Sequence, residues 1–127
     1  MKKTIQYVIM LTVSLMAASC YYDTLPPEPV IPLPDTVSYS EDVQPLWDES
    51  CVSCHKPGGT APDLTAANSY SALTVNNKYV IPGDAAGSKL HKSLVGDGAA
   101  IMPPAGKWSD SKIAIVDKWI NDGALNN

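Results

Sequence analysis

The stretch "SCVSCHKPGG", residues 50–59, places two cysteines three positions apart and a histidine directly after the second. Three kinds of site use this spacing: a redox-active dithiol, half of a zinc site, and the attachment point of a haem. Because these sites need different partners, the rest of the chain discriminates between them.

The motif lacks the partners that the first two interpretations require. A thioredoxin-like dithiol follows a strand, and no stretch of this sequence alternates like a strand for long. Zinc needs four ligands, and outside the motif only His91 and Cys20 remain as imidazole or thiol candidates. A haem needs two thiols for its vinyl groups and an adjacent imidazole for its iron. The pattern therefore predicts one covalent haem c per chain, with Cys51 and Cys54 as thioether anchors and His55 as the proximal iron ligand.

The first 20 residues have the features of an export signal. Lys2 and Lys3 precede the apolar run "YVIMLTVSLMAA", which is too short to span a bilayer and typical of a secretory signal. Its exit, "LMAASC", resembles the lipobox of bacterial lipoproteins, in which the cysteine is lipidated and becomes the new first residue. This implies a signal peptide at residues 1–19 and a lipid anchor on Cys20. An ordinary cleaved signal and an uncleaved anchor are the alternatives.

The segment "LPPEPVIPLP", residues 25–34, has five prolines in ten residues. Proline fixes the backbone and lacks an amide donor, so an extended segment is expected, with a reach of roughly 30 Å. Residues 20–38 are therefore interpreted as a tether, with a proline-rich partner-binding motif as the alternative. Without Lys2 and Lys3, seven lysines remain against 13 acidic residues, a formal charge of −6. That charge argues against nucleic acid and anionic lipid as partners.

Residues 39–127 are predicted to form one all-α domain. A first helix is expected to start at Glu41 or Asp42, because Pro45 is tolerated only near a first turn. A short helix is expected after Asp63 or Thr65, and another is expected to be capped by Asp84.

The last helix has the clearest pattern, with Ser109 or Asp110 as its cap and Gly123 where it stops. Its apolar residues recur at helical spacing: Ile113, Val116, Trp119 and Ile120.

Several short motifs recur together in one known family. "DVQPLW", "CVSCH", "IPGDAAGSKL", "MPPAGKWSD" and "IVDKWINDGA" resemble, in order and spacing, the monohaem cytochrome c domains of bacteria, over roughly 85 residues. The resemblance implies the cytochrome c fold, with three to five short helices around the haem. It also implies that a proline carbonyl after the motif, here that of Pro62, accepts a hydrogen bond from the proximal histidine.

Met102 is the expected sixth ligand of the iron. It is the only methionine after residue 19, and "IMPPAG" resembles the distal loop of the family. A gap-filling methionine of the core is the alternative role, and His91 is the competing ligand. Trp47 and Trp119 are expected to join the first and last helices. Trp108 is a candidate to reach a haem propionate through its indole N–H.

With both axial positions filled and no acid/base pair evident, the expected function is one-electron transfer rather than catalysis. The expected partners are a donor and an acceptor redox protein, and the expected state is monomeric. The alternatives are a haem-based gas sensor or peroxidase-like domain, which requires Met102 to be displaced, and a fixed electron-transfer subunit of a larger oxidoreductase. Tyr21 follows Cys20 where an Asp would resemble an inner-membrane retention signal, so an outer-membrane lipoprotein facing the periplasm or the exterior is expected.

Overall fold

The computed structural model describes residues 3–6 and 32–127. The chain divides into two units, Met1–Val30 and Ile31–Asn127, and of the first only a short helical turn at residues 3–6 is described. The expected signal peptide, Cys20 and most of the expected tether therefore lie outside the described residues. Within the described ranges, no helix is long and apolar enough to cross a membrane.

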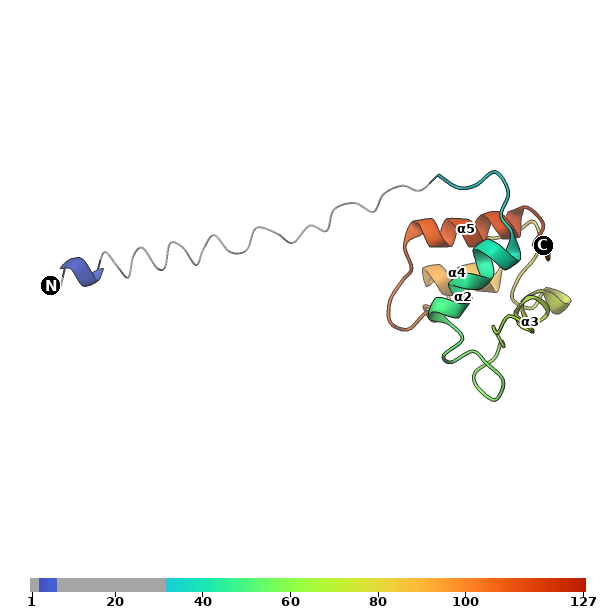
Figure 1. The fold of residues 1–127 in the computed structure, drawn as a ribbon, viewed down its shortest axis with the longest axis horizontal. Helices are drawn as coiled ribbons and strands as arrows, with labels where there is room; N and C mark the ends of the chain where they lie inside the picture. Colours follow the sequence, from blue (N-terminus) through green and yellow to red (C-terminus); the bar gives the residue numbers. More distant parts are fainter. Residues whose placement is uncertain (1–2, 7–31) are drawn as a thin grey trace. The chain divides into compact units, whose positions relative to one another are not determined.

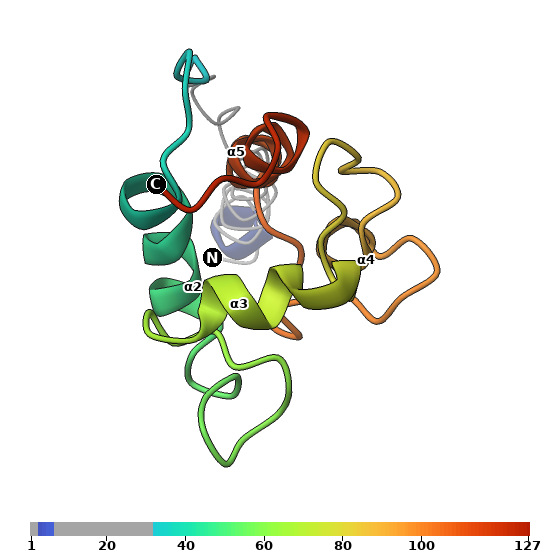
Figure 2. The same cartoon turned by 90° about the vertical axis from the view of Figure 1, so that its right-hand side faces the viewer.

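The second unit is built from helices and loops (Figure 1). In chain order these are a π-helical turn η1 (Tyr39–Val43), α2 (Gln44–Ser50), α3 (Ser69–Thr74), a 3-10 turn η2 (Val75–Asn77), α4 (Lys89–Val95) and α5 (Asp110–Asn121). Residues 32–127 contain no strand, and an isolated bridge joins Ile81 to Asp84. The predicted all-α class is confirmed. In Figure 2, α2 and α4 flank the interior, with α5 on one side of it and α3 on the other.

The first helical segment starts earlier than the sequence indicated. Ser38 is its N-cap and accepts from the Glu41 N–H, so the turn η1 begins at Tyr39 rather than at Glu41 or Asp42. The Gln44 N–H then bonds to the Tyr39 carbonyl, five residues back, which is the wider spacing of a π-helix. The α-helix proper begins only at Gln44, which leaves Pro45 in its first turn, where the missing N–H costs least.

Two other helices start later than expected. Asp84 does not cap α4: its carboxylate accepts from the Gly87 N–H at 2.8 Å and closes a turn, and the N-cap position belongs to Ser88. Asp63 likewise accepts from the Thr65 N–H at 3.0 Å, and a further turn separates it from α3. Both aspartates accept a hydrogen bond from a nearby N–H, but they do so in turns rather than at helix ends.

The prediction for the last helix is confirmed. Ser109 accepts from the Lys112 N–H as the N-cap of α5, and Gly123 follows its end with a φ of 104°. The four apolar residues at helical spacing, Ile113, Val116, Trp119 and Ile120, are all buried.

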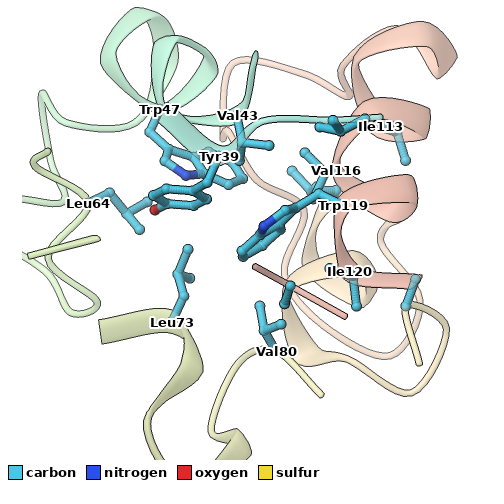
Figure 3. Close-up of a cluster of buried hydrophobic side chains, with 14 of the residues drawn as sticks. Tyr39, Val43, Trp47, Leu64, Leu73, Val80, Ile113, Val116, Trp119 and Ile120 are labelled. Atoms are coloured by element: carbon cyan, nitrogen blue, oxygen red, sulfur yellow. The ribbon is translucent and has the colours of Figure 1, made fainter. Parts of the chain in front are cut away.

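The core lies where these helices meet, and Figure 3 shows side chains from η1, α2, α3 and α5 converging there. Trp119 packs on Tyr39, with 5.0 Å between ring centroids, whereas Trp47 stacks on Trp108 at 5.7 Å. The expectation that Trp47 and Trp119 join the first and last helices is therefore wrong in its pairing. Tyr39 of η1 makes the ring contact with Trp119 instead.

Candidate functional site

The motif residues lie in the turn that follows α2. The Cys54 and His55 N–H groups both donate to the Cys51 carbonyl, at 3.1 and 2.9 Å, so the chain continues for one more turn past the helix end. Cys51 is half-buried and Cys54 is exposed, and both are free thiols. The turn thus presents two thiols and one imidazole within five consecutive residues.

The chain then folds back over the motif. The Thr60 N–H donates to the Cys54 carbonyl at 2.9 Å, and a side chain at Gly59 would collide with that same carbonyl oxygen. Gly58, with a φ of 77°, supplies the left-handed residue of this reversal. The two glycines therefore allow the backbone to approach the motif closely, which a side chain at Gly59 would prevent.

The orientation of His55 is set by a backbone carbonyl. Its Nδ1 lies 3.1 Å from the carbonyl oxygen of Pro62. Because a carbonyl only accepts, the ring must donate from Nδ1, which leaves the lone pair on Nε2. Pro62 thus supplies the carbonyl partner that is expected shortly after the motif. An imidazole held this way is suited to bind a metal through Nε2.

The end of the loop is fixed against both the motif and α2. The Leu64 N–H donates to the His55 carbonyl at 2.9 Å, and Gln44 of α2 donates its side-chain amide to the Leu64 carbonyl at 3.1 Å. Asp63 accepts from the Thr65 hydroxyl and N–H and from Asn68, and these bonds hold the pKa of Asp63 below its usual value. Hydrogen bonds therefore hold the loop both at its start, in the turn at Cys51, and at its end, at Leu64.

The protonation of Cys51 bears on the choice between the three kinds of site. Burial raises the pKa of its thiol to about 11, so at neutral pH it is a protonated thiol and a poor nucleophile. That is the opposite of what a redox dithiol needs. In the part of the chain that the structure describes, no three His, Cys, Asp or Glu side chains gather as a metal site requires. The raised pKa of Cys51 therefore speaks against a redox-active dithiol at this motif.

Met102 lies on a different segment, the loop between α4 and α5. Its N–H donates to the Ser93 carbonyl of α4 at 2.8 Å, and its side chain is half-buried. Farther along the same loop, Trp108 stacks on Trp47 of α2. The structure shows how Met102 is anchored to α4. Its role as an iron ligand stays a prediction.

His91, the competing ligand, is engaged elsewhere. Its Nδ1 lies 2.7 Å from the Asp117 carboxylate, with the two side chains 22% and 26% exposed. The pair joins α4 to α5 and uses one of the two ring nitrogens. This contact gives His91 a structural role.

Comparisons with known proteins give one likeness of fold. No family model matches this chain, and no curated protein is significantly similar to it. Among solved structures, a chain of Kuenenia stuttgartiensis hydrazine synthase superposes with a TM-score of 0.57 and 22% identity. The match covers 70% of this chain and 16% of the other, so the chain spans about a sixth of the length of its structural neighbour. At this identity the comparison shows a shared fold and nothing more.

Proposed function

We propose that residues 39–127 form a monohaem cytochrome c domain that carries single electrons in the cell envelope. The observation that supports this most directly is the orientation of His55, whose Nδ1 is paired with the Pro62 carbonyl. Covalent haem attachment needs two cysteines for the haem edge and, directly after the second, a histidine for the iron. The hydrogen bond at Nδ1 leaves Nε2 of His55 as the nitrogen that can bind the iron.

The residues of the turn have distinct roles in this proposal. A haem c, when bound, supplies an iron that cycles between ferric and ferrous states. Cys51 and Cys54 hold it as thioethers, and because those bonds consume both thiols, the cysteines take no part in redox chemistry. His55 supplies the proximal nitrogen, and Pro62 keeps the ring from rotating. Gly59 lets the loop lie close to the motif.

Met102 is the proposed distal ligand. Its thioether suits a soft iron centre, and its backbone is held by the bond to Ser93 while Pro103 follows it directly. We expect Met102→Ala to remove the thioether charge-transfer band from the spectrum of the ferric protein. His91→Ala is the matched control and leaves the band unchanged, because the band arises from the Met102 thioether and needs no imidazole from His91. A low-spin spectrum that survives Met102→Ala and is lost in His91→Ala would reverse the assignment.

A domain whose iron has two protein ligands is suited to electron transfer, since little moves when the charge on the iron changes. We therefore propose a carrier between a donor and an acceptor redox protein rather than an enzyme, with a fairly high reduction potential from His/Met ligation. The ferrous protein should then resist carbon monoxide at low concentration. Ready binding would instead favour the gas-sensing or peroxidase-like alternative.

One comparison favours a second candidate, a fixed electron-transfer subunit. The solved structure that shares this fold has it as 16% of a much longer chain. The fold thus occurs as one part of a larger protein. Purification from the native membrane distinguishes the two candidates: a carrier elutes as a monomer, and a fixed subunit elutes with an oxidoreductase of higher mass.

The proposed attachment to the membrane depends on Cys20, which lies outside the described residues. We propose that it carries the lipid of an outer-membrane lipoprotein and that residues 20–38 link it to the domain. Cys20→Ser should release the haem-containing domain into the soluble fraction. Retention of that variant in the membrane would favour an uncleaved anchor.

A further inference from the structure

A chain of hydrogen bonds between buried polar side chains joins η1, α3 and α2. The Tyr39 hydroxyl donates to the Ser69 hydroxyl at 2.7 Å, and the Ser69 hydroxyl donates to Oε1 of Gln44 at 2.5 Å. Ser69 is 0% exposed, Tyr39 4% and Gln44 7%. Burial raises the pKa of Tyr39, so its hydroxyl keeps the proton that it donates. The direction of every bond in this chain is therefore set, and the chain ends at the amide of Gln44.

The amide of Gln44 has one orientation in this network. Because Oε1 accepts from Ser69, the NH2 group is left to donate, and it does so twice. One bond goes to the Leu64 carbonyl at 3.1 Å and the other to the Asp48 carboxylate at 2.8 Å. A carbonyl and an ionised carboxylate only accept, so a reversed amide would pair with neither. A buried network in which each member is paired is rigid.

The bond from Gln44 to Leu64 connects this network with the motif. Leu64 lies two residues after Pro62, and the Leu64 N–H donates to the His55 carbonyl at 2.9 Å. The ring of His55 is in turn paired with the Pro62 carbonyl at 3.1 Å. Gln44 thus holds the carbonyl of a residue whose N–H is bonded to the backbone of His55.

Gln44 also gives this end of the loop a contact with another part of the fold. In the ranges that the structure describes, the backbone hydrogen bonds of residues 56–64 otherwise join the loop to the motif or to itself. The Asp63 side chain bonds to Thr65 and Asn68, which follow it within five residues. The amide of Gln44 instead comes from α2, 20 residues before Leu64. It therefore fixes the Leu64 carbonyl relative to the helix that precedes the motif.

We propose that Gln44 is a positioning residue for the iron ligand His55, an inference that rests on the proposed function. Its amide holds the Leu64 carbonyl, and the short backbone from Leu64 back to Pro62 then keeps the Pro62 carbonyl at Nδ1 of the ring. A partner at Nδ1 fixes the orientation of an imidazole and makes it a more basic ligand. Gln44 thus acts on the reduction potential of the iron without being one of its ligands.

The test compares two variants of the haem-loaded, full-length protein. Gln44→Leu fills the same space with an apolar side chain of similar size, and the Leu64 carbonyl loses its donor. Ser69→Ala is the matched control, because it breaks the same network on the Oε1 side and leaves the bond from Gln44 to Leu64 in place. Chemical denaturation measures how much stability each variant loses.

The reduction potential and the ring proton of His55 separate positioning from a loss of stability. We expect Gln44→Leu to raise the potential, because a less basic imidazole stabilises the ferric state less. The Nδ1 proton of His55 should exchange with solvent about tenfold faster, the factor that one lost hydrogen bond supplies. Ser69→Ala should change neither. Shifts in both variants in proportion to their losses of stability would show a merely structural role and overturn the proposal, as would no shift in Gln44→Leu.

A measurement on the wild-type protein covers the case in which Gln44→Leu does not fold. The side-chain N–H groups of Gln44 and the Nδ1 proton of His55 should exchange through the same opening, with the same dependence on denaturant. Exchange of the His55 proton while the Gln44 amide stays protected would overturn the proposal. If the wild-type chain carries no haem by mass, the proposed function fails, and the same exchange comparison on that chain decides whether Gln44 holds the His55 ring.

Discussion

The helical core and the turn after α2 are stabilised in different ways. In α5, apolar side chains at helical spacing are buried almost completely: Val116 and Ile120 are 0% exposed. In the turn, by contrast, residues 56–61 are all exposed, and the chain is held by backbone hydrogen bonds to Cys51, Cys54 and His55. Burial therefore determines the scaffold, whereas the candidate site depends on how closely one backbone segment passes over another.

The largest effect on stability is expected from the core. Trp119→Ala removes a side chain that is 1% exposed and in ring contact with Tyr39. We expect a loss of about 3–5 kcal/mol in the free energy of unfolding. The matched change in the turn, Lys56→Ala at an exposed position, should stay within about 0.5 kcal/mol. Chemical denaturation of both variants measures the two losses in free energy of unfolding. Similar losses would contradict the claim that burial stabilises the core but not the turn.

The two cysteines should differ in reactivity before haem attachment. Burial raises the pKa of Cys51 from 9.0 to about 11. Its thiolate is then about a hundredfold scarcer at pH 8 than that of an unperturbed thiol. Iodoacetamide should therefore modify the exposed Cys54 first, as read by peptide mass. Faster modification of Cys51 than of Cys54 would refute the expected difference in reactivity.

The same burial makes stability depend on pH. Because the folded chain favours the neutral thiol of Cys51, the stability of the haem-free chain is unaffected below about pH 9 and falls as the pH rises from 9 toward 11.

A methyl group at Gly59 tests the close approach in the turn. Gly59→Ala would place a side chain against the Cys54 carbonyl oxygen, which is backbone and cannot rotate away. We expect a loss of about 1–3 kcal/mol and a smaller fraction of chains with haem attached. Gly83→Ala is the control: its φ of 84° is left-handed and strained for alanine, but the position is open. It should cost about 1 kcal/mol and leave haem attachment unchanged. Equal haem attachment in both variants would show that haem attachment does not need the close approach of Gly59 to the Cys54 carbonyl.

The smallest effect is expected at the cap of α5. Ser109→Ala removes the oxygen that accepts from the Lys112 N–H. The expected cost is about 1 kcal/mol, seen as a lower midpoint of thermal unfolding. Ser111→Ala, inside the same helix, should be neutral or slightly stabilising because alanine is the better helix former. A larger loss at Ser111 than at Ser109 would show that Ser109 is not the cap.

The sequence predicted α5 well because its cap, period and stop signal are local and agree with one another. It placed the starts of α3 and α4 too early, since Asp63 and Asp84 resemble caps. Whether such a residue starts a helix or a turn depends on distant contacts: Ser88, the actual cap position of α4, is held by the Ile81 N–H at 2.8 Å. The π-helical turn was missed for a similar reason, because residues at the end of the chain bond to its first residues. Asn127 accepts from Tyr39 and Ser40 at 2.9 Å each.

The candidate site was predictable as a set of residues but not as an arrangement. The spacing of Cys51, Cys54 and His55 is visible in the sequence, and the structure gives His55 a partner in Pro62. The burial of Cys51 and the hydrogen bonds of Gln44 are not visible, because they arise from packing between segments far apart in the chain.

The most direct test of the central claim is the intact mass of the chain produced in cells that attach haem to cytochromes c. We expect one covalent haem per chain, retained after acid extraction and absent from Cys51→Ser/Cys54→Ser. We also expect a reduced pyridine spectrum typical of two thioether bonds. A mass equal to that of the polypeptide alone, or one lower by two hydrogens because Cys51 and Cys54 form a disulfide, would contradict it.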